Sequence, residues 1–212
     1  MIEPLLQQFI SYVQQQPNLE LYNEAGLQHE LALFLRSKLD VIYRVQLERN
    51  IGHVAQIPEN FRKKEMDIYI ENLTNLDEKY CIELKVSHGR SVASRIIKIH
   101  EDIYFLEQLK KQKFRECFFM FATPSNKFME TKPGRLKMYD TFSEKGIKID
   151  HLHNSHVSPS YKNSNGEYVY KYDEMYVKHY EANWQPLKSQ VTRDFVSLPS
   201  VKEEWKCVLV AV

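Results

Sequence analysis

The chain alternates helical and strand-like patterns in an order that restricts its fold more than any other feature of the sequence. Residues 24–39 repeat apolar positions at helical spacing, and residues 92–112 do so over a longer stretch. The apolar run 117–123 is typical of a strand buried on both faces. Three further strand-like segments lie between the two helices, at 41–49, 65–73 and 79–86. This order predicts an α+β (α/β) fold with a central mixed β-sheet flanked by helices.

Length and composition favour one folded domain inside a cell. The chain has 212 residues, of which 43% are hydrophobic, enough to fill a core. Its cysteines, Cys81, Cys117 and Cys207, are few and far apart, which excludes a disulfide framework and suits a reducing compartment. The N-terminus lacks the basic start of a signal peptide, and no apolar run reaches the length of a membrane span. We therefore expect a cytoplasmic protein with no membrane partner.

The segment that follows residue 123 is predicted to be a β-rich C-terminal extension. A short helix is expected at 135–144, before a strand at 148–152. Two tyrosine-rich strands, 168–172 and 175–180, are expected to form a hairpin, and the apolar end 207–212 suits a buried strand. The domain prediction is a single domain over 1–212, with its core at about 24–123 and the extension at about 124–212.

Two charged residues interrupt an otherwise apolar strand. Glu83 and Lys85 are two residues apart, so their side chains point to the same face, while Leu84 points to the other. If the strands at 65–73 and 79–86 pair as a hairpin, Asp67 lies near Glu83. Burying such charges is costly unless they are paired or bind a metal. The alternative is a solvent-facing ion pair on an edge strand, which is common in antiparallel sheets.

These residues resemble the PD-(D/E)XK nuclease superfamily, which has the restriction-endonuclease-like fold. The resemblance rests on Asp67, on the Glu83-Leu84-Lys85 motif 15 residues further on, and on the order of the surrounding helices and strands. It covers about residues 24–123. Glu30, in the segment that precedes the strands, is similar to the acidic residue on the family's first helix. Met66 stands where the proline that gives the family its name would be, a position at which the family often departs from proline.

The resemblance implies a metal-dependent mechanism. Asp67, Glu83 and the backbone carbonyl of Leu84 are expected to hold Mg²⁺, with Mn²⁺ as an alternative ion. Glu30 is expected to reach the metal directly or through water, or to help hold a second ion, and so joins the catalytic set. Lys85 is expected to polarise the attacking water and stabilise the charge that develops on the phosphate.

Basic residues gather after the Glu83-Leu84-Lys85 motif and just before the Asp67 strand. Such clusters bind phosphates, although a solvated helix face explains those near the end of the second long helix equally well. The residues expected to contact nucleic acid are Lys64, His88, Arg90, Arg95 and Gln108.

Together these features predict a Mg²⁺-dependent DNA endonuclease of the restriction or defence type. The alternative is a nucleic-acid-binding protein on a nuclease fold that does not cleave, or cleaves only with a partner. DNA is the expected partner, and the resemblance leaves open a homodimer or a partner subunit. A third alternative is an interaction protein in which the charged strand is an exposed edge.

Overall fold

The computed structural model describes residues 1–55, 63, 65–130, 141–149, 152–154, 161–162, 168–169, 173–175, 179–192 and 201–212. Within these residues the α-helices are α1 (Ile2–Gln15), α2 (Glu24–Lys38) and α3 (Val92–Lys111). Two short 3-10 helices lie at Ile51–His53 and Asn126–Phe128. The helices predicted from apolar periodicity, at 24–39 and 92–112, are thus confirmed.

A six-stranded mixed sheet forms the centre of the molecule. Its strand order is β1-β2-β3-β4-β12-β11, and only β3 and β4 run parallel to each other. The strands are β1 (Tyr43–Asn50), β2 (Glu65–Asn72), β3 (Lys79–Val86), β4 (Glu116–Thr123), β11 (Gln185–Thr192) and β12 (Val201–Ala211). The predicted α+β fold with a mixed sheet flanked by helices is confirmed. The apolar C-terminal strand lies beside β4, so the segment after residue 123 also completes the central sheet.

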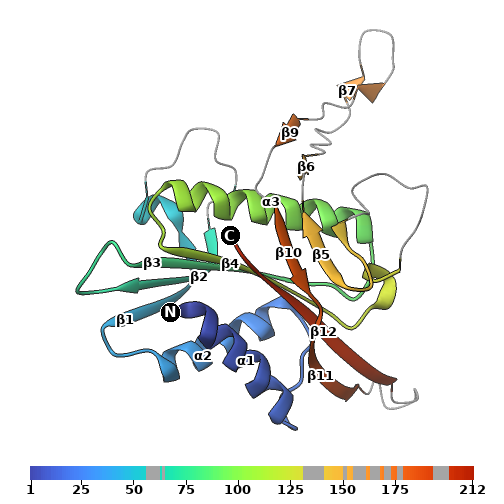
Figure 1. Cartoon of the computed structure of the whole chain (residues 1–212), viewed down its shortest axis with the longest axis horizontal. Coiled ribbons are helices and arrows are strands. Elements are labelled where there is room, and N and C mark those ends of the chain that lie inside the picture. The colour runs from blue at the N-terminus through green and yellow to red at the C-terminus, as the bar shows by residue number, and fades with distance from the viewer. Residues whose placement is uncertain are drawn as a thin grey trace.

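Three layers make up the fold, with α1 and α2 on one face of the sheet and α3 on the other (Figure 1). Side chains alternate along each strand, so a central strand contributes to the core on both faces of the sheet. Ile82 and Leu84 of β3 pack in the core with α1 and α2, whereas Cys81 packs in the core with α3. The strand β4 is buried on both faces, as its apolar sequence predicts, with Phe118 in one core and Phe119 in the other.

Short strand pairs occupy the segment between β4 and β11. They are β5 (Gly146–Ile149) with β10 (Tyr180–Asn183), β6 (Leu152–Asn154) with β9 (Asp173–Met175), and β7 (Tyr161–Lys162) with β8 (Tyr168–Val169), all antiparallel. The predicted hairpin of 168–172 with 175–180 is wrong. Asp173 and Glu174, which would form its turn, lie within β9 and pair with β6. Most of the helix predicted at 135–144 lies outside the described residues, and its described end differs, since Phe142 forms a β-bridge with Ile147.

Local sequence sets the two helix starts that border the end of β3. Asn23 caps α2, its side-chain oxygen accepting a hydrogen bond from Gly26 N at 2.8 Å. The turn from β3 to α3 passes through Gly89, whose φ of +78° favours glycine. A Cβ at this position would collide with the side chain of Ser125. The start of α2 lies beside the residue that follows Lys85, since Glu24 accepts a hydrogen bond from Val86 N at 3.0 Å.

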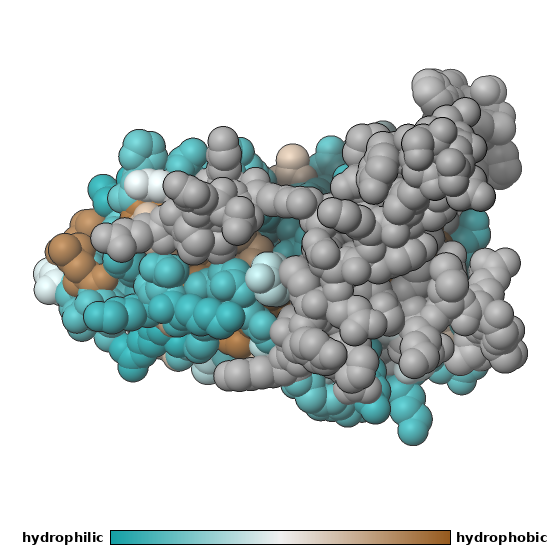
Figure 2. Space-filling view, turned by 90° about the horizontal axis from the view of Figure 1, so that it is seen from above, coloured by the Kyte–Doolittle hydropathy of each residue, from teal (hydrophilic) through white to brown (hydrophobic). Residues whose placement is uncertain are grey.

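Much of the described surface on the α3 side is hydrophilic. Figure 2 looks onto this side and shows hydrophobic residues at the left end of the view, where Figure 1 places the turn between β2 and β3. Leu73 and Leu76 are exposed in that turn. In the part of the chain that the structure describes, no helix is long and apolar enough to cross a membrane.

Candidate active site

Asp67 and Glu83 meet where β2 and β3 diverge. The backbone pairing of β2 with β3 ends at Ile68 and Ile82. Beyond this pair the Asp67 side chain takes over, because its Oδ2 accepts a hydrogen bond from Leu84 N at 2.7 Å. The backbone N–H of Asp67 lies 3.4 Å from Glu83 Oε1. The hairpin geometry therefore places the two carboxylates side by side, as the sequence predicts. Leu84 joins the site through its N–H, while a role for its carbonyl stays a prediction.

Glu83 and Lys85 are buried in the middle of the sheet. The side chain of Glu83 is 0% exposed and that of Lys85 is 11% exposed, and β3 lies between β2 and β4. The alternative of a solvent-facing ion pair on an edge strand is therefore wrong. A central strand with two buried charges is stable only where other charges compensate them.

Lys85 is held by carboxylates from two helices. Its Nζ lies 3.2 Å from Glu24 Oε1 at the start of α2 and 3.2 Å from Asp102 Oδ2 in the middle of α3. Glu24 also accepts a hydrogen bond from Val86 N at 3.0 Å through its other oxygen. Burial alone would lower the pKa of Lys85, but the charges of Asp102 and Glu24 outweigh it and raise the pKa. The ammonium group therefore stays charged at neutral pH.

A second lysine, Lys63, enters the same site from the segment before β2. Its Nζ forms an ion pair with Glu83, lies 2.9 Å from Asp102 Oδ1 and 3.9 Å from Asp67 Oδ1. The Phe105 ring lies beneath it, with 5.4 Å between Nζ and the ring centre. We call this group the ion-pair cluster; its members are Glu24, Lys63, Asp67, Glu83, Lys85 and Asp102.

Electrostatics in the cluster is dominated by burial and by the excess of acidic groups. Burial raises the pKa of Glu83 well above its usual value, the charges of Asp67 and Asp102 raise it further, and Lys63 opposes the shift. Burial would lower the pKa of Lys63, but the surrounding carboxylates raise it. Oδ2 of Asp102 is buried and accepts no hydrogen bond from the described residues, although Lys85 lies nearby.

Gln28 supports the backbone beneath Asp67. One turn after Glu24 on α2, its amide donates to Asp67 O at 2.6 Å and to Glu48 Oε1 at 2.7 Å. Glu48 faces Asp67 across β1 and β2, since its neighbours pair with Ile68 and Met66, and it has a positive φ of 50°. A non-glycine residue in this conformation is unusual and is often found at functional sites.

Glu30 lies away from the ion-pair cluster, which corrects the prediction that it joins the metal site. It follows Gln28 by two residues, so its side chain projects about 200° around the helix from that of Gln28. Glu24 takes the place expected for the helical acid, because positions 24 and 28 share the face of α2 that reaches Asp67 and Lys85.

The residues predicted to contact nucleic acid fall into three groups. His88 and Arg90 are exposed just beyond β3, and Arg95 in the first turns of α3 lies 4.0 Å from Glu24. Gln108 follows Asp102 by six residues on α3, about 9 Å along the helix, so the structure does not bring it to the cluster. Lys64 lies outside the described residues.

Sequence reasoning missed four supporting residues: Glu24, Gln28, Lys63 and Asp102. Only Asp102 carries a clear signal, because it interrupts the apolar stripe of α3 between Ile99 and Leu106. Lys63 belongs to the basic run before the Asp67 strand, in which Lys64 was the expected contact. The choice of Lys63 depends on where the chain enters β2, which apolar periodicity does not reveal.

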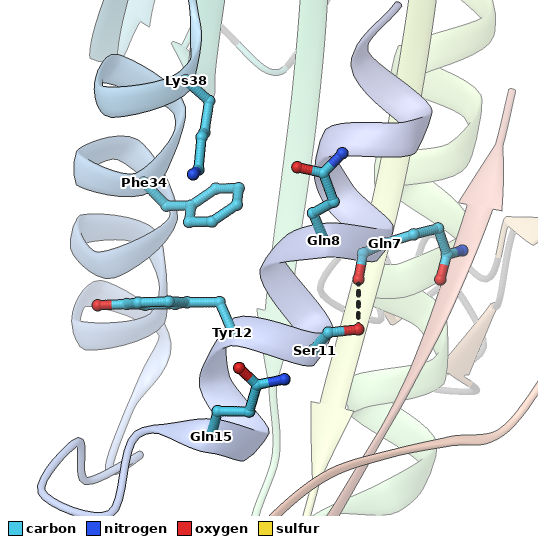
Figure 3. A pocket seen from close by; sticks show the side chains of 7 residues that line it. All are labelled: Gln7, Gln8, Ser11, Tyr12, Gln15, Phe34 and Lys38. Atoms are coloured by element: carbon cyan, nitrogen blue, oxygen red, sulfur yellow. Dashed lines mark hydrogen bonds between the residues drawn. The ribbon is translucent and has the colours of Figure 1, made fainter.

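Elsewhere, an open groove of about 410 Å³ lies between α1 and α2. Figure 3 shows Phe34 and Lys38 of α2 opposite Gln8 of α1, with Tyr12 and Gln15 further along α1. Lys38 Nζ lies 5.7 Å from the centre of the Phe34 ring. No acidic residue lines this groove, so it lacks the hard anionic ligands of a metal site.

Comparison with known proteins identifies no relative: no family model matches the chain, and no curated protein or solved structure matches it. The functional argument therefore rests on the site. Within the described residues, no three His, Cys, Asp or Glu side chains converge closely enough to hold a metal ion as they are placed. In the ion-pair cluster, lysine amines lie between the carboxylates.

Proposed function

We propose that this chain is a Mg²⁺-dependent nuclease that hydrolyses phosphodiester bonds in DNA, with a restriction-endonuclease-like core. One observation carries the proposal: Asp67 and the fully buried Glu83 lie side by side in the middle of a sheet, with the Lys85 ammonium two residues further along β3. Purely structural charges are seldom kept in such a place, because apolar residues of similar volume are often at least as stable.

The residues fit a hard divalent cation. Mg²⁺ is usually held by one or two carboxylates together with waters and substrate phosphate oxygens, so Asp67 and Glu83 are a sufficient side-chain set. The acidic excess of the cluster, four carboxylates facing two amines, favours added positive charge. When bound, the ion would lower the pKa of a coordinated water and neutralise charge on the scissile phosphate.

Lys85 would supply a fixed positive charge to the reaction. Because Glu24 and Asp102 raise its pKa, the amine acts as a cation and hydrogen-bond donor rather than as a general base. Its two carboxylate partners come from α2 and α3, so both helices determine where the ammonium lies. A charge that is positioned before the reaction stabilises the transition state without reorganisation.

A nucleic-acid phosphate backbone fits the surroundings of the cluster, and DNA is the proposed substrate. His88 and Arg90 are exposed directly after β3, and Arg95 is partly exposed at the start of α3. Such groups contact the phosphate backbone and set the position of the strand relative to the cluster. The proposal includes endonucleolytic cleavage of the restriction or defence type.

The test is cleavage of supercoiled plasmid by purified protein with Mg²⁺ or Mn²⁺. Wild type should nick or linearise the plasmid, EDTA should stop the reaction, and Asp67→Asn and Lys85→Met should each lower the rate at least about 100-fold. Thermal unfolding of both variants checks that the fold is retained. Lys145→Met, which removes an exposed charge in the turn before β5, is the matched control and should cut at the wild-type rate.

The alternative, a binding protein that does not cleave, predicts a different result. Folded wild-type protein would then cut neither double-stranded nor single-stranded DNA nor RNA with either metal. DNA binding would be unchanged by Asp67→Asn. That pair of results would refute the nuclease proposal.

A further inference from the structure

Lys63 places a positive charge between the two motif carboxylates. Its Nζ is ion-paired with Glu83 and lies 3.9 Å from Asp67 Oδ1, and Asp102 Oδ1 completes its surroundings at 2.9 Å. A divalent ion that bridges Asp67 and Glu83 must lie within about 2.0–2.6 Å of their oxygens. Such an ion and the Lys63 amine would occupy the same small volume, so they cannot be bound there together.

The charges of the cluster explain why a lysine is drawn in. Four carboxylates, from Glu24, Asp67, Glu83 and Asp102, face the two amines of Lys63 and Lys85. Lys85 lies between Glu24 and Asp102, which leaves Glu83 with Lys63 as its cationic partner. A fully buried carboxylate without a cation is strongly disfavoured. The position beside the ionised Glu83 therefore favours positive charge, whether from an amine or from a metal.

Lys63 can leave this position more readily than the cluster residues of β3 and α3. It precedes β2 rather than lying within a strand or helix, and its side chain is 28% exposed, against 0% for Glu83 and 7% for Asp102. Its amine is joined to the cluster through a flexible four-carbon side chain. Rotation of that side chain towards solvent would open the space between Asp67 and Glu83 without moving the sheet.

We propose, on the basis of the metal site in the proposed function, that Lys63 is an internal competitor of the divalent cation. With Lys63 in place the carboxylates are neutralised and the site is closed to metal; with metal bound the Lys63 amine is displaced. Apparent metal affinity then falls in proportion to the fraction of molecules in which the site is open. If the amine is in place in about 90–99% of molecules, wild type binds metal about 10–100-fold more weakly than a chain without this amine.

The first experiment measures Mn²⁺ binding by electron paramagnetic resonance at fixed pH and ionic strength. Lys63→Met keeps the side-chain length and removes the charge, and should bind Mn²⁺ at least 10-fold more tightly than wild type. Lys98→Met, which removes an exposed charge from α3, is the matched control and should bind as wild type does. Adding Glu83→Gln to Lys63→Met should abolish the gain, because the ion loses a ligand.

Equal or weaker Mn²⁺ binding by folded Lys63→Met would overturn the proposal and make Lys63 a structural ion-pair partner. A second measurement uses wild-type protein and so does not depend on the folding of the variant. Acetylation of Lys63 by a water-soluble amine reagent, followed by mass spectrometry, should be slow without metal and faster in Mn²⁺. Unchanged or slower labelling in Mn²⁺ would equally overturn it.

These readouts are independent of DNA cleavage. If Lys63→Met binds metal more tightly but the protein cuts no nucleic acid, the proposal for Lys63 stands and the nuclease proposal is refuted. If the protein cuts DNA and Lys63→Met leaves the metal affinity unchanged, the nuclease proposal stands and the proposal for Lys63 is refuted.

Discussion

Replacement of Glu24 by glutamine is the most direct test of how the site is built. Glu24 Oε1 lies 3.2 Å from Lys85 Nζ, and Oε2 accepts a hydrogen bond from Val86 N at 3.0 Å. Glutamine has nearly the same shape and can still accept one of these bonds, but it removes the negative charge. The control is Glu30→Gln, the same chemical change six residues later on the same helix, at a site that does not reach the cluster.

The expected magnitude follows from exposure. Hydrogen bonds to charged groups contribute about 1.5–3 kcal/mol when buried, whereas exposed ion pairs contribute about 0.2–1 kcal/mol. The Glu24 side chain is 37% exposed, so solvent screening limits its interaction with Lys85 to about 1 kcal/mol. If this interaction free energy is lost only in the transition state, DNA cleavage slows by about 5-fold. Loss of an acid from the first turn of α2 also lowers the free energy of unfolding, by about 0.3–1 kcal/mol.

Two assays separate these effects. Initial rates of plasmid nicking in Mg²⁺ report on the site, and urea denaturation reports on the fold. Glu30→Gln should leave the rate within about 2-fold of wild type and the unfolding free energy within about 0.5 kcal/mol. If Glu24→Gln and Glu30→Gln have equal rates, Glu24 does not position Lys85 and the reasoning is wrong.

Two further predictions concern the fold around the site. Gly89→Ala should lower the free energy of unfolding by about 2 kcal/mol in urea denaturation, because residue 89 has a positive φ and a Cβ meets Ser125; an unchanged midpoint would contradict the described turn. Burial raises the pKa of Cys117 and Cys207 to about 12 and that of Cys81 well above its usual value. Native protein at pH 8 should therefore react with a thiol reagent only as fast as it unfolds. Rapid labelling of any of the three cysteines would argue against this core.

The fold of residues 24–123 was predictable because its signals are local. Alternation in 65–73 and 79–86 predicts β2 and β3, and the 3–4-residue spacing in 92–112 predicts α3, each to within a residue or two. The position of β12 was not predictable, since its place beside β4 is a contact between distant segments. Pairing between short strands was also hidden: β8 and β9 each pair with an earlier strand rather than with each other.

The site was predictable to the extent that strands determine it. Glu83 and Lys85 share a face because side chains alternate along β3, and Asp67 follows from pairing with β2. The prediction of Glu30 as the helical acid of the site failed for a physical reason, and Glu24 takes that place. Both are helical acids near an apolar face, and only the rotation of α2 relative to β3 decides which one reaches Lys85. That rotation is set by packing against the sheet, which periodicity alone does not specify.

The origin of the cluster residues links its chemistry to the tertiary structure. Lys85 receives its two partners from α2 and α3, which cover opposite faces of the sheet, so neither helix alone can position the amine. Asp102 contacts Lys63 through one oxygen and Lys85 through the other, which couples the two amines. Displacement of Lys63 by a metal would leave Asp102 with Lys85 as its cationic partner within the cluster and strengthen that contact. The same carboxylate that helps close the site around Lys63 would then hold Lys85 more firmly once the metal is bound.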